Sequence, residues 1–362
     1  MEQNIKPFKR FIFFIRSKIF ILCFQIAVLF FIVGFVGGRY TLLKGVIPAN
    51  PEIRGSLVRL GNYNFINPLL WCEIIGNREV IPEYKPMKEY MSQVIDEQIA
   101  QGKIKTASIF LSTLNTGRWF GVNENEQFSP ASMLKVTIMI SFFKLQEEIP
   151  DIMKKTIVYD GSFDDDAIEN IKNNNPLIVG KSYTIEELIE NMIIDSGNNA
   201  RRLLKTYLFE RDQQYLNQVY TDLRLSDPPA NGGDYMSPRE YSSIFRVLYN
   251  ATYLSRGSSE KALQILSKAS FADGIVAGVP SGTTVSHKFG ERKFVNSDGS
   301  SVSELHDCGI VYYPGHPYFL CIMTKGEDEK VLASVVAKIS SEAYGQIGTY
   351  FKKFDSNTSV AR

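Results

Sequence analysis

Residues 128–135 read Phe128-Ser129-Pro130-Ala131-Ser132-Met133-Leu134-Lys135 and lead into an apolar segment with the pattern of a helix. Residues three apart on one helix face lie about 5–6 Å from each other, so the Lys135 amine can reach the Ser132 hydroxyl. A serine hydroxyl is a weak nucleophile until a base stands beside it, and a lysine in a suitable environment can be that base. The stretch therefore predicts a serine nucleophile with its own amine. An ordinary amphipathic helix start is the alternative.

A second segment, Ser196-Gly197-Asn198, carries side chains that would serve the same chemistry. It ends a helical pattern that opens with a capping-box pair, Thr184 and Glu187. At such a helix end, a second hydroxyl can pass protons and an amide can hold a substrate. A plain helix stop at Gly197 is the alternative interpretation.

A third segment, Lys288-Phe289-Gly290, lies in a stretch that we expect to be a short strand. A lysine on this strand can bind a substrate carboxylate, and the glycine lets a substrate lie close to the backbone. An exposed lysine on an edge strand is the alternative. The order Ser-x-x-Lys, Ser-x-Asn, Lys-x-Gly is typical of enzymes that form an acyl-serine.

With these motifs, residues 84 to 355 resemble the class A branch of the serine beta-lactamase and penicillin-binding protein superfamily. A turn at 115–117, a strand and turn over 307–315 and a final helix from about 329 to 354 extend the resemblance. It implies an α/β (α+β) fold of the beta-lactamase/transpeptidase type. That fold has an antiparallel sheet flanked by helices, together with a helical lobe.

The resemblance also implies roles for individual residues. Ser132 would be the acylated nucleophile, Lys135 its general base and Ser196 a proton relay. Four residues would bind the substrate: Asn198, Lys288, Gly290 and Glu291. The backbone N–H groups of Ser132 and Glu291 would form the oxyanion hole. No cofactor and no metal are implied.

The chain departs from the class A pattern at three places. Phe289 stands where the family has a small hydroxyl side chain, and Gly197 stands where class A enzymes have an aspartate. The loop before the helix at Ser237 lacks the glutamate that positions the hydrolytic water. Its only carboxylates are Asp212, Asp222, Asp227 and Asp234. Unless Asp227 or Asp234 replaces that glutamate, we expect acylation to proceed and deacylation to be slow.

Three activities stay open at this point. The first is hydrolysis of a beta-lactam by a serine hydrolase, as the overall resemblance implies. The second is a penicillin-binding or D-alanyl-D-alanine peptidase-like enzyme that acts on peptidoglycan stem peptides and deacylates slowly. The third is a non-catalytic module that binds the cell wall, and the complete set of motif residues argues against it.

Residues 19–36 form an apolar run that only Gln25 interrupts, and extension to residue 38 gives the length of a bilayer span. Five lysine and arginine residues precede the run, against two that closely follow it, which predicts that the chain after it lies outside the cytoplasm. The prediction is a cytoplasmic segment 1–18, a transmembrane signal anchor 19–38, a stalk or connecting arm 39–83 and a catalytic domain 84–362. A cleaved signal peptide is the alternative.

Composition excludes several other classes of function. The formal net charge of +1 gives no basic surface that would indicate nucleic-acid binding. His287, His306 and His316 lack metal-ligand spacing, and no Gly-x-Ser-x-Gly elbow supports a Ser-His-Asp hydrolase. Cys308 and Cys321 face each other if residues 314–315 form a tight turn, so they form either a cross-strand disulfide or two buried thiols.

Overall fold

The computed structural model describes residues 25–26, 28–31, 57–72, 84–168, 171–229, 233–295 and 301–359. The chain divides into two compact units, Met1–Gly55 with Ile74–Asn77 and Ser56–Glu73 with Arg78–Arg362. In the first unit, residues 25–26 and 28–31 are helical and exposed. Most of the predicted anchor 19–38 and the predicted boundaries at 18, 38 and 83 lie outside the described residues. Among the described residues, no helix combines the length and the apolar composition that a membrane span needs.

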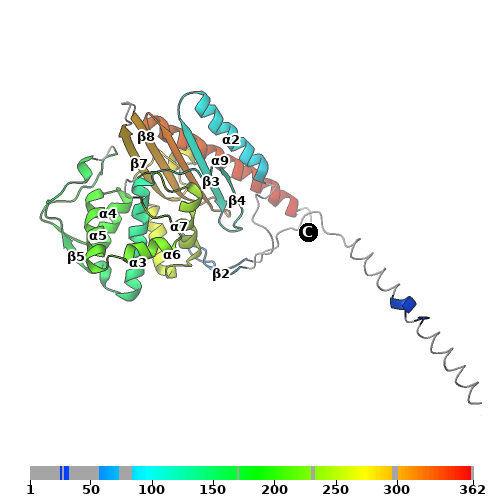
Figure 1. The fold of residues 1–362 in the computed structure, drawn as a ribbon, viewed down its shortest axis with the longest axis horizontal. Helices are drawn as coiled ribbons and strands as arrows, with labels where there is room; N and C mark the ends of the chain where they lie inside the picture. The colour runs from blue at the N-terminus through cyan, green and yellow to red at the C-terminus, as the bar shows by residue number, and fades with distance from the viewer. Residues whose placement is uncertain are drawn as a thin grey trace, which may run out of the picture. The chain divides into compact units, whose positions relative to one another are not determined.

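An antiparallel sheet of five strands forms one half of the second unit, in the order β4-β3-β9-β8-β7. Its strands are β3 (Thr106–Thr113), β4 (Trp119–Val122), β7 (Val285–Val295), β8 (Ser301–Val311) and β9 (Tyr318–Gly326). The helices α2 (Lys85–Ala100) and α9 (Glu329–Ser359) pack on each other and cover one face (Figure 1). The predicted turn at 115–117, the strand from 307 and the final helix from 329 are confirmed.

A helical lobe packs against the other face of the sheet. It contains α3 (Lys135–Glu148), α4 (Ile185–Ile194), α5 (Asn198–Arg211), α6 (Tyr215–Asp222), α7 (Pro238–Asn250) and α8 (Arg256–Leu266). Short elements complete it: β5 (Thr156–Val158), β6 (Ser182–Thr184), and the 3₁₀ helices η2 (Ala131–Leu134), η3 (Ile152–Lys154) and η4 (Asp166–Ile168). The 3₁₀ helix η5 (Val276–Gly278) packs instead against α9, on the other face of the sheet. Thr184 forms the predicted capping box of α4.

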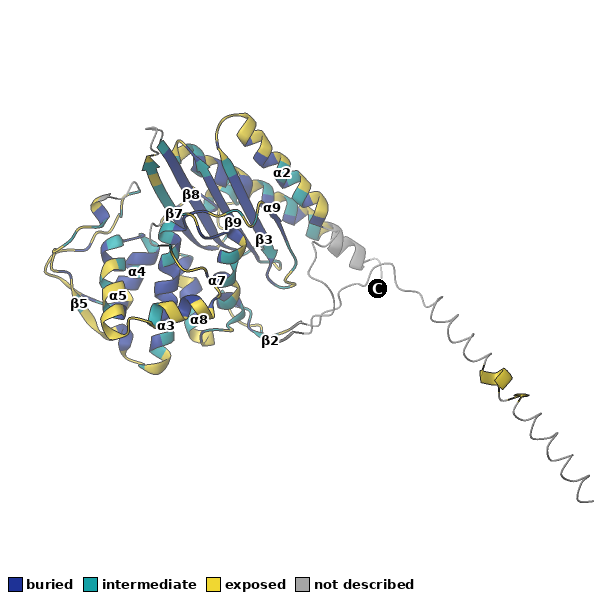
Figure 2. Cartoon of the chain, in the orientation of Figure 1, coloured by how far each residue is buried: buried dark blue, intermediate teal, exposed yellow. Residues whose placement is uncertain are grey.

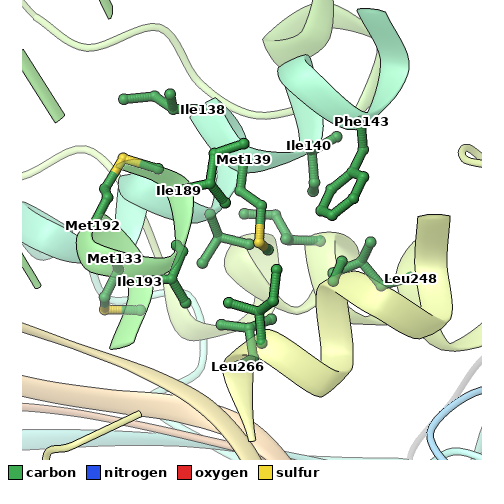
Figure 3. Packing of buried hydrophobic residues seen from close by; sticks show 14 of the residues in the cluster. Met133, Ile138, Met139, Ile140, Phe143, Ile189, Met192, Ile193, Leu248 and Leu266 are labelled. Carbon is green, nitrogen blue, oxygen red and sulfur yellow. The ribbon is translucent and has the colours of Figure 1, made fainter. Parts of the chain in front are cut away.

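The helix α3 runs through the middle of this lobe. Ten of its 14 residues are buried, so it is apolar on nearly every side, as expected of a central helix. Figure 3 shows Met139 and Phe143 of α3 packed with Ile189 of α4, Leu248 of α7 and Leu266 of α8. The first residues of α3, Lys135 to Thr137, are buried as well; Figure 2 colours the chain by burial.

Part of the predicted connecting arm is packed onto this unit. The antiparallel pair β1 (Leu57–Arg59) and β2 (Leu69–Cys72) is fixed by the Arg59 guanidinium, which donates to the carbonyl oxygen of Leu114 at 2.7 Å and to Asn250 Oδ1 at 2.8 Å. The carboxylate of Glu260 accepts the backbone N–H groups of residues 64–66. Residues 57–72 thus belong to the folded unit.

Cys308 and Cys321 form a disulfide between directly opposite positions of β8 and β9. Both side chains are fully buried. Of the two alternatives that the sequence left open, the structure has the cross-strand bridge.

We predict that replacing both cysteines, Cys308→Ala with Cys321→Ala, lowers the free energy of unfolding by roughly 3 kcal/mol, because the bridge closes a short loop in the unfolded chain. Urea denaturation of oxidised and reduced protein measures this. The double variant serves as its own control, since a reducing agent should no longer change its midpoint. Equal midpoints for oxidised and reduced wild-type protein would contradict the prediction.

Candidate active site

Ser132 lies in η2, the 3₁₀ turn that leads directly into α3. The turn begins with Ala131 in the left-handed region, at φ 46°, a conformation that costs a non-glycine residue about 1–2 kcal/mol. The N–H of Met133 donates to the carbonyl oxygen of Pro130 at 3.0 Å. Ser132 is half-buried, whereas Lys135, the first residue of α3, is 1% exposed. The predicted helix start is therefore a 3₁₀ turn that places the hydroxyl ahead of a buried lysine.

The Ser196 hydroxyl brings the three sequence motifs together. Its Oγ accepts hydrogen bonds from Lys135 Nζ and from Lys288 Nζ, each at 3.0 Å. Lys135 also donates to the carbonyl oxygen of Ser196, and Lys288 to that of Phe289 at 3.1 Å. A hydroxyl has two lone pairs, so these two bonds use both of them and leave its own proton for a third group. Ser196 thereby links α3, the loop before α5 and β7.

Asn198 is the first residue of α5, and the carboxylate of Asp166, the first residue of η4, caps this helix. Asp166 Oδ1 accepts the backbone N–H groups of Asn198 at 2.6 Å and Asn199 at 3.0 Å. Its Oδ2 accepts from Asn173 Nδ2 at 3.0 Å. A carboxylate at a helix N-terminus satisfies free N–H groups and complements the helix dipole. Sequence reasoning missed Asp166, because the cap comes from about 30 residues upstream and leaves no local pattern.

Gly197 has no room for the aspartate that class A enzymes carry. A Cβ atom there would lie 2.0 Å from Asn191 Oδ1 and 2.9 Å from Asn173 Nδ2. Asn191 is itself fixed, because its Nδ2 donates to the carbonyl oxygen of Asn175 at 2.6 Å. The two asparagines occupy the space that a side chain at position 197 would need.

Phe289 is buried beside the site. Its ring stacks on Phe271 with centroids 4.3 Å apart, and Lys288 Nζ lies 4.0 Å from the Phe289 centroid. Lys288 is itself fully buried. The aromatic side chain that replaces the family's hydroxyl is thus packed on a second ring and contacts the lysine through its π face.

Gly290 lies against the turn that holds Ser132. A Cβ at Gly290 would meet the carbonyl oxygen of Pro130 at 2.6 Å and Met133 Cγ at 2.9 Å. We expected the glycine to give a substrate access to the backbone, but protein atoms fill that space. Its physical role is the close approach of β7 to the nucleophile turn.

Glu291 follows Gly290 on β7, so its backbone N–H lies one residue from the contact with the nucleophile turn. Its Oε1 accepts the N–H of Ile171 at 2.8 Å. Burial and the neighbouring Glu291 carboxylate raise the pKa of Glu329, at the start of α9, to about 7. The side chain of Glu291 thus belongs to a carboxyl pair at the sheet edge, and the predicted oxyanion role concerns its main chain alone.

Three of the four carboxylates in the loop region have other partners. Asp212 accepts a backbone N–H before α6 at 2.9 Å, and Asp222 accepts from a glutamine and a tyrosine hydroxyl. Asp234 forms an ion pair with Lys325. The side chain of Asp227 is exposed.

The model of a family described as the beta-lactamase enzyme family matches residues 87–347. The solved structure of PBP-A is 20% identical and covers 73% of this chain and 97% of its own, with a TM-score of 0.59. A PBP-A mutant, solved as an acyl-enzyme complex with penicillin G, is 21% identical, and the match covers 72% of this chain and 97% of the mutant's chain, also with a TM-score of 0.59. A beta-lactamase from Sphaerobacter thermophilus DSM 20745 is 19% identical and covers 72% and 96%, with a TM-score of 0.58. These structures share the fold, and none of the curated proteins matches the chain.

We predict that Gly290→Ala destabilises the protein by about 1–3 kcal/mol, because the added methyl group must displace the backbone of the nucleophile turn. Gly345→Ala on α9 is the matched control. Its Cβ would enter open space, and alanine is the better helix former, so it should be neutral or slightly stabilising. Thermal unfolding of both variants measures the difference, and equal stabilities would refute the contact.

We also predict a pH dependence from Glu329. Because its pKa in the folded protein is about 7 and its ordinary value is 4.5, the folded state holds the proton more tightly. Wild-type stability should therefore fall as pH rises from about 4.5 to about 7. Glu329→Gln should remove this fall and be more stable than wild type at pH 8. Urea midpoints across this range test it, with Glu97→Gln on the exposed side of α2 as control; parallel curves for wild type and Glu329→Gln would contradict it.

Proposed function

Because the chain belongs to the beta-lactamase enzyme family, we propose that Ser132 attacks the carbonyl carbon of a beta-lactam ring and forms an acyl-enzyme. The protein is a serine hydrolase of the beta-lactamase type. The observation that carries the proposal is the Ser196 hydroxyl, which is bonded to the ammonium groups of both Lys135 and Lys288 beside the turn of Ser132.

Each group has a defined task in this reaction. A second cation beside Lys135 favours its neutral form, which can take the proton of the Ser132 hydroxyl as the new C–O bond forms. The backbone N–H groups of Ser132 and Glu291 stabilise the oxyanion. When the ring C–N bond breaks, the Ser196 hydroxyl passes a proton to the departing nitrogen. Lys288 attracts the substrate carboxylate, and Asn198 contacts the bound substrate.

Hydrolysis of the acyl-enzyme should be slow. Asp212, Asp222 and Asp234 all have partners elsewhere, and Asp227 is exposed to solvent. The same observations, with Gly197, favour a second candidate, a penicillin-binding or peptidase-like enzyme that acts on peptidoglycan stem peptides. The lifetime of the acyl-enzyme distinguishes the two.

We place this chemistry outside the cytoplasm, on a single-pass anchor over residues 19–38. The segment 1–18 would be cytoplasmic, 39–83 the connecting arm and 84–362 the catalytic domain. The buried Cys308–Cys321 disulfide supports this location, because disulfides persist in oxidising compartments.

The test is intact-mass spectrometry of the full chain mixed with a fluorescent penicillin and sampled from seconds to hours. We expect an adduct on Ser132 that forms quickly and decays slowly. Ser132→Ala should give no adduct, and Lys135→Ala should acylate at least about a thousandfold more slowly, since it removes the base.

The decay of the adduct decides between the two candidates. Steady turnover of the chromogenic cephalosporin nitrocefin with a transient adduct indicates a working beta-lactamase. An adduct that persists for hours indicates the penicillin-binding-like alternative. Full activity of Ser132→Ala would refute the assignment of the nucleophile, and no adduct on wild-type protein would favour a different acyl donor or a cell-wall-binding module.

A further inference from the structure

Four titratable residues lie under the segment that leads into the nucleophile turn, and the proposed reaction uses none of them. Glu304 and His306 of β8 and Lys325 of β9 lie on the sheet face toward the helical lobe, and Asp234 precedes α7. Glu304 and Lys325 are directly opposite each other in the register of β8 and β9. We call these four residues the support cluster.

His306 fixes the backbone at Ser129. Its Nδ1 accepts the N–H of Thr324 at 3.2 Å, so its Nε2 carries the proton and donates to the carbonyl oxygen of Ser129 at 3.1 Å. The ring of His306, which is fully buried, also meets the edge of Phe128 with centroids 5.3 Å apart. These contacts lie three and four residues before Ser132.

Lys325 joins three parts of the molecule. Its Nζ lies 3.3 Å from Glu304 Oε1, pairs with Asp234 and donates to the carbonyl oxygen of Gln127 at 3.4 Å. It also lies 4.8 Å from the centroid of the Phe128 ring. One ammonium group therefore holds the sheet, the segment before Ser132 and the end of the loop before α7.

The loop before α7 is coupled to the nucleophile segment a second time, through the backbone. The N–H of Phe128 donates to the carbonyl oxygen of Met236 at 3.0 Å, and the Phe128 carbonyl accepts from the N–H groups of Tyr235 and Met236. Any movement of residues 127–129 must therefore move residues 235–236 as well.

Burial of the charged groups of the support cluster costs free energy of solvation. Both carboxylate oxygens of Glu304 are buried; Oε1 lies 3.3 Å from Lys325 Nζ and Oε2 lies 3.9 Å from His306 Nε2. Burial alone raises the pKa of Glu304, but the His306 ring and the Lys325 ammonium outweigh it and hold that pKa below its ordinary value. A buried ion pair is weak evidence for stability, because desolvation of the charges offsets their attraction.

We propose that Lys325, held by Glu304, is a positioning residue that presses the nucleophile turn against Gly290 and keeps the Ser132 hydroxyl aligned for attack. This inference rests on the proposed function. It assigns Lys325 an effect on the rate of the chemical step and none on substrate binding, since Lys325 contacts Gln127 and Phe128, which precede the turn, from the side of the sheet. A misplacement of about 1 Å at a reacting atom costs on the order of a hundredfold in rate.

The experiment uses the detergent-solubilised full chain and four variants. Lys325→Met removes the ammonium but leaves Glu304 buried without its counter-ion, which can prevent folding. Lys325→Met combined with Glu304→Gln removes both charges and is the decisive variant. Lys325→Arg restores the charge. Lys338→Met is the matched control, because Lys338 forms an exposed ion pair with Glu342 on α9, at 3.4 Å.

Acylation rates are measured against the concentration of the fluorescent penicillin, which separates the saturating rate from the half-saturating concentration. In the double variant we expect the saturating rate to fall at least tenfold while the half-saturating concentration changes less than twofold. Lys325→Arg should recover most of the rate, and Lys338→Met should match wild type. A purely structural role would lower the melting temperature without this division between rate and binding.

Hydrogen exchange of residues 127–135 provides a readout that does not depend on the acyl donor. Glu126 keeps this segment attached to β3 through the hydroxyls of Thr106 and Ser108, so a loss of protection should begin after it. We expect exchange of these residues to be at least tenfold faster in the double variant than in wild type. In Lys338→Met the exchange rate should equal that of wild type. If wild-type protein forms no adduct, the proposed function fails and this measurement alone decides the inference. Unchanged exchange, or unchanged acylation in the double variant of an active enzyme, would overturn it.

Discussion

The Ser196 hydroxyl accepts hydrogen bonds from two buried ammonium groups, and much of the architecture serves to bring those three groups to one point. Lys135 must begin a helix in the middle of the lobe, Lys288 must lie on the edge strand of the sheet, and Ser196 must sit at φ 58° between α4 and α5. Two buried charges are costly unless their donors are satisfied, so the arrangement tolerates little displacement. The distant cap from Asp166 helps to fix the Ser196 loop.

The second requirement is close contact between the sheet and the nucleophile turn. Gly290 allows β7 to approach the carbonyl oxygen of Pro130, and the support cluster holds the preceding residues from β8 and β9. The Cys308–Cys321 disulfide joins those same two strands within the core. The sheet therefore supports the turn of Ser132, which lies between the sheet and the helical lobe.

The departures from the class A pattern are packed into the structure with partners of their own. Asn191 and Asn173 fill the space at Gly197, and Phe271 stacks on Phe289. Neither departure can be reversed by a single substitution without displacing these neighbours, because an added side chain at position 197 would overlap Asn191 Oδ1 and Phe289 is stacked on another ring.

Part of the secondary structure could be predicted from the sequence, because it depends on interactions between residues that are close together in the chain. The capping box at Thr184 and the turn at 115–117 were predicted correctly, because caps and turns depend on residues close together in the chain. The roles of Ser132 and Lys135 stay predictions. The anchor over 19–38 stays a prediction of this kind. Other features required the folded chain: Lys135 and Lys288 reach Ser196 across 61 and 92 residues, and Lys325 reaches Asp234 across 91. Contacts over such separations depend on how the lobe packs against the sheet, and no pattern of neighbouring residues encodes them.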